Sequence, residues 1–107
     1  MNLHEKKCVP CEGGTQPLSV EKVGEYLPLL KNQWSVLENK KILHEFTFET
    51  FTSAITFVNK VATIAETEGH HPDIHIHYNK VVIELWTHAI NGLSENDFIV
   101  AAKIEKI

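Results

Sequence analysis

Histidine is the residue type in this chain that is best suited to chemistry near neutral pH, and its distribution is uneven. Five of the seven histidines lie between positions 70 and 88, namely His70, His71, His75, His77 and His88. Two neighbouring imidazoles can hold one protonated and one neutral ring at the same time. Such a pair can donate a proton to one atom and accept a proton from another. The pattern therefore indicates general acid/base chemistry.

The histidines fall on a predicted β-hairpin. Residues 73–78 and 81–86 each alternate apolar with polar side chains, which is the period of a half-buried strand. Residues 79–80 would form a two-residue turn between the two runs. With that turn, Ile76 faces Ile83 and the count beyond the strand ends places His71 opposite His88. The register predicts that two imidazoles meet at the open end of the hairpin, with His70 beside them.

Three interpretations of this cluster remain open at this point. Paired imidazoles suit the dehydration of a carbinolamine, because the hydroxyl must gain a proton and a nitrogen must lose one. A strand-end histidine can also be a plain polar surface residue. Alternatively, His75 and His77 on one strand face, with His71 or His88 nearby, would supply three nitrogen ligands to zinc.

Composition places the chain among ordinary globular proteins. Its 107 residues are 43% hydrophobic and 22% charged, which is enough for one domain and one core. A net charge of −4 and the lack of a Lys/Arg cluster argue against a nucleic-acid surface. Residues 1–7 lack the apolar segment of a secretory signal, so we expect a cytoplasmic protein. Cys8 and Cys11 have C-x-x-C spacing, but their loop-like surroundings favour neither a metal nor a redox role.

The order of elements predicts a two-layer α+β sandwich, in which a four-stranded antiparallel sheet carries three helices on one face. We expect an irregular N-terminal arm over residues 1–18 and a single domain over residues 19–107. Pro28 should kink or end the first helix near Leu27. The expected elements are a helix over 19–31, strands over 34–37 and 41–48, a helix over 50–68, the hairpin, and a helix that opens at 93–98.

The helix over 50–68 has two apolar stripes, one more than is needed to cover a sheet. The second stripe predicts a contact with a partner subunit. Gly69 should end this helix and place His70 and His71 on a defined turn. Ser94 and Asp97 resemble a capping box at the start of the last helix.

Several segments together resemble the signature of the pterin-4a-carbinolamine dehydratases, and the likeness covers nearly the whole chain. They are Glu68-Gly69-His70-His71-Pro72, Tyr78-Asn79-Lys80-Val81, Trp86-Thr87-His88 and Leu93-Ser94-Glu95-Asn96-Asp97. The resemblance implies dehydration of 4a-hydroxytetrahydrobiopterin to quinonoid dihydropterin, a reaction that recycles the cofactor of aromatic amino-acid hydroxylases. It further implies no metal or other cofactor, a homodimer or homotetramer, and a hydroxylase as functional partner.

The resemblance also assigns site residues. His70, His71 and His88 match the catalytic histidines, and we expect His71 and His88 to transfer protons while His70 binds substrate or acts as a second acid. The expected substrate-binding residues are Pro72, Asp73, Trp86 and Asp97. Asn96 departs from a basic residue that some members carry. The alternative function is a non-catalytic dimerisation cofactor or pterin-binding module, with a link to molybdopterin metabolism.

Overall fold

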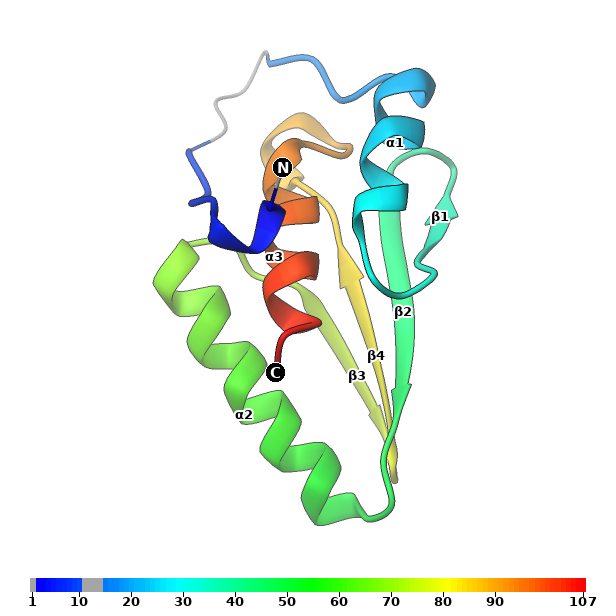
Figure 1. Cartoon of the computed structure of the whole chain (residues 1–107), viewed down its shortest axis with the longest axis vertical. Helices are drawn as coiled ribbons and strands as arrows, with labels where there is room; N and C mark the ends of the chain where they lie inside the picture. Colours follow the sequence, from blue (N-terminus) through cyan, green and yellow to red (C-terminus); the bar gives the residue numbers. More distant parts are fainter. Residues whose placement is uncertain (1, 11–14) are drawn as a thin grey trace.

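The computed structural model describes residues 2–10 and 15–107 as an α+β fold (Figure 1). The α-helices are α1 (Val20–Tyr26), α2 (Phe51–Glu68) and α3 (Glu95–Ile104). The strands are β1 (Ser35–Leu37), β2 (Lys41–Thr47), β3 (Asp73–His77) and β4 (Lys80–Leu85). Short 3-10 turns are η1 (Leu3–Glu5), η2 (Leu27–Leu29) and η3 (His88–Ile90). The predicted fold class and the element order α-β-β-α-β-β-α are confirmed.

The four strands form one antiparallel sheet in the order β1-β2-β4-β3. Its central strands supply fully buried side chains to the core, among them Ile42, Val81, Ile83 and Leu85. α3 packs against both α2 and η1, and most of its side chains are buried as a result. The N-terminal end of α3 therefore has a fixed place relative to the sheet, and this end carries Asp97.

The predicted hairpin exists, but its predicted register is wrong. β3 and β4 pair with Ile76 opposite Val81 and His77 opposite Lys80, so the turn is Tyr78-Asn79 rather than Asn79-Lys80. A long-range contact explains the difference. The backbone of Asn79 accepts a hydrogen bond from the Phe48 N–H at 2.8 Å, and its side-chain amide donates to the Phe48 carbonyl at 2.8 Å.

Because the register moves by two residues, every side chain stays on its predicted face of the sheet. The expected cross-strand pair of His71 and His88 is nevertheless lost. The histidines must therefore be brought together by other elements than the hairpin ladder.

The first helix is shorter than predicted. α1 ends at Tyr26 and the chain continues as the 3-10 turn η2, which contains Pro28. Proline removes a backbone donor and clashes with the preceding turn, so the α-helical hydrogen bonds stop before it. The expectation that Pro28 ends the helix near Leu27 is confirmed, whereas the extension to Lys31 is not.

α2 begins and ends as its sequence indicates. Thr50 caps its first turn by accepting a hydrogen bond from the Ser53 N–H, and Gly69 closes it in the left-handed conformation at φ 66°. One face buries Ala54, Phe57, Val61 and Ala65. The stripe that contains Ala54 and Ala65 also contains Phe51, which remains 49% exposed, and a subunit contact of this helix stays a prediction. Among the described residues, no helix has the length and apolar character required to cross a membrane.

Candidate active site

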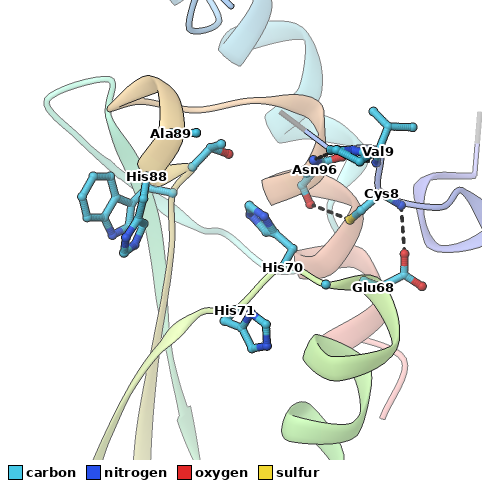
Figure 2. Close-up of a pocket in the computed structure, with 12 residues that line it drawn as sticks. Cys8, Val9, Glu68, His70, His71, His88, Ala89 and Asn96 are labelled. Atoms are coloured by element: carbon cyan, nitrogen blue, oxygen red, sulfur yellow. Dashed lines mark hydrogen bonds between the residues drawn. The ribbon is translucent and has the colours of Figure 1, made fainter. Parts of the chain in front are cut away.

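A cavity of about 540 Å³ lies where the end of α2, the end of β4 and the start of α3 meet the N-terminal arm (Figure 2). Its volume is within the usual range for small-molecule sites. The lining residues are Cys8, Val9, Pro10, Glu68, Gly69, His70, His71, Trp86, Thr87, His88, Ala89 and Asn96. All three histidines that were predicted to be catalytic therefore line one cavity.

His70 is held by the most deeply buried polar network of the site. Its Nε2 lies 2.6 Å from Oδ1 of Asp97, a carboxylate with no exposed surface. A carboxylate accepts hydrogen bonds, so the network assigns the Nε2 hydrogen to His70. Nδ1 is then the ring nitrogen that remains for proton exchange, as in other carboxylate-oriented histidines.

Asp97 has two functions at once. Its Oδ2 accepts the Ser94 backbone N–H at 2.9 Å, which confirms the capping box at the start of α3. The same oxygen accepts the Thr87 hydroxyl at 2.8 Å, and that hydroxyl lies 2.8 Å from the Ser94 hydroxyl. The helix cap thus holds the carboxylate in the position where it orients His70.

His71 has a different environment, although it follows His70 directly. Its Nε2 lies 2.5 Å from Oε2 of Glu66, and the two side chains are 61% and 78% exposed. Gly69 turns the chain out of α2 just before both histidines, and the His70 side chain is only 12% exposed. His71 is consequently the solvent-side member of the pair (Figure 2).

His88 is oriented by an aromatic ring rather than by a carboxylate. Its ring stacks on Trp86 with centroids 3.9 Å apart and an interplanar angle of 28°. Trp86 is itself fixed, because its indole Nε1 donates to Asp73 Oδ2 at 3.1 Å and Lys41 Nζ lies 5.4 Å from its ring centre. Asp73 and Lys41 thus position His88 through Trp86.

The predicted substrate-binding residues separate into two groups. Trp86 lines the cavity, and Asp97 lies behind its wall as the partner of His70. Pro72 and Asp73 are outside the set of lining residues, and a substrate contact by either stays a prediction.

Sequence reasoning missed two features of the site. Thr87 lies between Trp86 and His88, both of which the sequence singled out. Only the structure shows that its buried hydroxyl donates a hydrogen bond to Asp97. The contribution of the arm to the cavity wall was not predicted from the sequence either.

The zinc alternative finds no matching geometry. In the part of the chain that the structure describes, no three His, Cys, Asp or Glu side chains converge to hold a metal ion. His75 instead pairs with Glu84, with 3.0 Å between Nε2 and Oε2. A pair on one strand face does not become a chelate without a third nearby ligand.

Cys8 is a half-buried thiol in the wall of the cavity. Its burial and the neighbouring Glu68 carboxylate raise its pKa from 9.0 to about 12, so it stays protonated at neutral pH. A protonated thiol is a poor nucleophile and a poor metal ligand. Cys11, its partner in the C-x-x-C spacing, lies outside the described residues.

Comparisons with known proteins agree with this geometry. The family model described as pterin 4 alpha carbinolamine dehydratase matches residues 16–107. A relative from Rickettsia canadensis is 50% identical over 103 residues, which cover 96% of this chain and 94% of the relative. One from Alkaliphilus metalliredigens is 46% identical over 105 residues, covering 98% and 95%. Both are named as candidate pterin-4-alpha-carbinolamine dehydratases.

Solved structures give the same result. A crystal structure of a transcriptional coactivator/pterin dehydratase from Brucella melitensis has a TM-score of 0.79 and 32% identity, covering 85% of this chain and 97% of that one. A pterin dehydratase-like RuBisCO assembly factor, at 20% identity and a TM-score of 0.61, covers 71% and 89% and supports the fold alone. With the family model covering most of its length and full-length relatives near half identity, the chain belongs to the pterin-4a-carbinolamine dehydratase family.

Proposed function

We propose that this protein is a hydro-lyase that converts 4a-hydroxytetrahydrobiopterin to quinonoid dihydropterin. The observation that carries the proposal is the buried network of His70, Asp97 and Thr87 in the wall of a cavity that His71 and His88 also line. Family membership supplies the substrate class, and the histidines supply the acid and the base.

The reaction requires two proton transfers, at an oxygen and a nitrogen that are bonded to the same carbon. The hydroxyl on the carbinolamine carbon gains a proton and leaves as water with the electron pair of the C–O bond. The nitrogen bonded to that carbon loses its proton, and the electron pair of its N–H bond forms the new C=N bond. One group must therefore give a proton while another accepts one, which two histidines near neutral pH can do.

We assign these transfers to His70 and His88, and a binding role to His71. His70 is oriented by a buried carboxylate, and His88, although exposed, is oriented by a stacked indole. The ring of His71 is 61% exposed and pairs with an exposed glutamate. A fixed ring loses less freedom on reaching the reactive geometry than a solvated one. This assignment exchanges the roles that we expected for His70 and His71 from the sequence, and the turnover experiment decides between them.

The experiment is a dehydratase turnover assay on the purified chain with His70→Gln, His88→Gln and His71→Gln. His77→Gln is the matched control, because His77 is exposed on β3 and is outside the lining residues. We expect the first two variants to lose about 100-fold in kcat or more, the third to lose mainly in KM, and the control to match wild type.

Two other outcomes have clear meanings. A wild-type protein that gives no acceleration over the uncatalysed dehydration would reject the enzyme proposal and favour the dimerisation cofactor or pterin-binding module. A His71 variant that loses more kcat than the His70 variant would restore His71 and His88 as the proton-transfer pair.

We also propose the setting in which the reaction takes place. The protein would act in the cytoplasm as a homodimer or homotetramer and recycle the pterin of an aromatic amino-acid hydroxylase. The half-exposed Phe51 at the start of α2 supports a subunit contact. Sedimentation of wild type and Phe51→Glu measures the oligomeric state, and a smaller assembly in the variant is expected.

A further inference from the structure

The N-terminal arm contributes three residues to the cavity wall, and these precede the region that the family model matches. Cys8, Val9 and Pro10 line the cavity, whereas the family model begins at residue 16. The figure of the site places Cys8 and Val9 beside the first turn of α3 and across the cavity from His88 (Figure 2). A segment that precedes the domain thus closes one side of its site.

The arm is attached at several points along its length. Leu3 is 3% exposed in the core, and Lys103 Nζ donates to the His4 carbonyl at 2.9 Å. Lys6 Nζ contacts Glu95 Oε2 at 2.8 Å. These contacts are with α3 and the core, so the arm has a defined path before it reaches the cavity.

Asn96 makes the decisive attachment. Its Oδ1 accepts the Val9 N–H at 3.1 Å and its Nδ2 donates to the Val9 carbonyl at 2.5 Å, so the side chain binds this residue as a neighbouring strand would. The Cys8 thiol lies 3.7 Å from the Asn96 carbonyl, and the Cys8 N–H donates to Glu68 Oε1 at 2.9 Å. Asn96 is 5% exposed, and its amide points to the arm.

We propose that Cys8–Pro10 is a substrate-binding wall of the pterin site and that Asn96 is the residue that positions it. The inference rests on the proposed function. The wall presents an uncharged thiol, an aliphatic side chain and a proline ring, which fit an uncharged part of the pterin rather than a phosphate or carboxylate. Because Asn96 directly precedes Asp97, the same turn of α3 places this wall and orients His70.

Two variants test the wall by steady-state kinetics. Asn96→Ala removes both hydrogen bonds to Val9, and we expect KM to rise roughly tenfold with a much smaller change in kcat, because binding must then also order the arm. Val9→Trp adds bulk to the wall without touching the backbone contacts, and a rise in KM of roughly fivefold is expected.

Each variant has a matched control. Asn59→Ala removes an exposed amide on α2, and Val20→Trp enlarges a side chain that is 69% exposed, close to the 65% of Val9. Both controls should keep wild-type KM. If circular dichroism shows that Asn96→Ala does not fold, Val9→Trp decides the question alone, since an exposed site tolerates bulk. Unchanged KM in a folded Asn96→Ala or in Val9→Trp would overturn the proposal.

A second readout does not depend on turnover. In a Cys11→Ser background Cys8 is the sole cysteine, and its alkylation by iodoacetamide in alkaline buffer, where a larger fraction of the thiol is ionised, reports on the arm. We expect saturating 7,8-dihydrobiopterin to slow alkylation at least fivefold, and Asn96→Ala to speed it roughly tenfold by exposing the thiol. Equal rates with and without this pterin would overturn the wall, even if the enzyme turns over. Protection without turnover would instead reject the dehydratase proposal and retain the wall.

Discussion

His70 and His71 are neighbours in sequence and each binds one carboxylate, yet the two pairs differ in nearly every other respect. The ring-to-carboxylate distances are almost equal, 2.6 Å to Asp97 and 2.5 Å to Glu66. The side chains of the first pair are 12% and 0% exposed, and those of the second are 61% and 78% exposed. Asp97 has two further donors, from Ser94 and Thr87.

The comparison shows that burial and connectivity, rather than distance, decide what such a pair can do. Water screens the exposed pair and competes for both partners, so its net contribution is about 0–1 kcal/mol. The buried pair has no such competitor, and removal of one partner leaves a polar group unsatisfied at a cost of about 1–3 kcal/mol or more. Only the buried pair can hold one ring in one orientation.

The largest effect is expected from Asp97→Asn. The amide keeps one oxygen for Ser94 and Thr87 but presents hydrogens to His70, so the ring must take the opposite tautomer or lose its partner. We expect kcat to fall about 100-fold or more, and the free energy of unfolding to fall by about 1–3 kcal/mol. Turnover and urea denaturation measure the two effects; an active Asp97→Asn would show that the buried pair is structural only.

Trp86→Leu extends the comparison to the third histidine. It removes the ring on which His88 stacks and the donor to Asp73, while an apolar side chain still covers the end of the sheet. We expect kcat to fall about tenfold because His88 then samples more orientations, with little change in stability. Lys41→Gln keeps the stack but removes the cation near the indole and the ion pair with Glu84 at 3.2 Å, so we expect a smaller loss in kcat, of about twofold.

Thr87→Val sharpens the comparison by removing one donor from the buried pair while preserving shape. Asp97 Oδ2 retains the Ser94 N–H but loses the hydroxyl at 2.8 Å. The expected loss is about 1–2 kcal/mol in the free energy of unfolding and a few-fold in kcat. A variant as stable as wild type would mean that the network does not depend on this hydroxyl.

The smallest effect is expected from Glu66→Gln. The substitution removes the charge that faces His71, but both side chains are mostly in water. Stability should change by less than about 0.5 kcal/mol and kcat by less than about twofold. A loss comparable with that of Asp97→Asn would break the distinction between the buried and the exposed pair.

Much of the fold followed from local patterns in the chain. Alternation predicted β2, β3 and β4, Gly69 predicted the end of α2, and Ser94 with Asp97 predicted the capping box. The hairpin register was the main error, because the turn is fixed by Asn79 binding Phe48, a residue 31 positions away. A two-residue window around the turn holds no information about that contact.

The sequence by itself determined the element types, the faces of the strands and the family signature, because these depend on periodicity and on residues close together along the chain. Only the tertiary structure decided that Asp97 serves both the helix cap and His70, that His88 rests on Trp86, and that the arm reaches the cavity. Those outcomes depend on how α3 packs between α2 and the arm, through contacts such as His70–Asp97, 27 positions apart, and Lys6–Glu95, 89 positions apart. Burial then distinguishes the His70–Asp97 pair from the His71–Glu66 pair, although the two histidines are adjacent in the sequence.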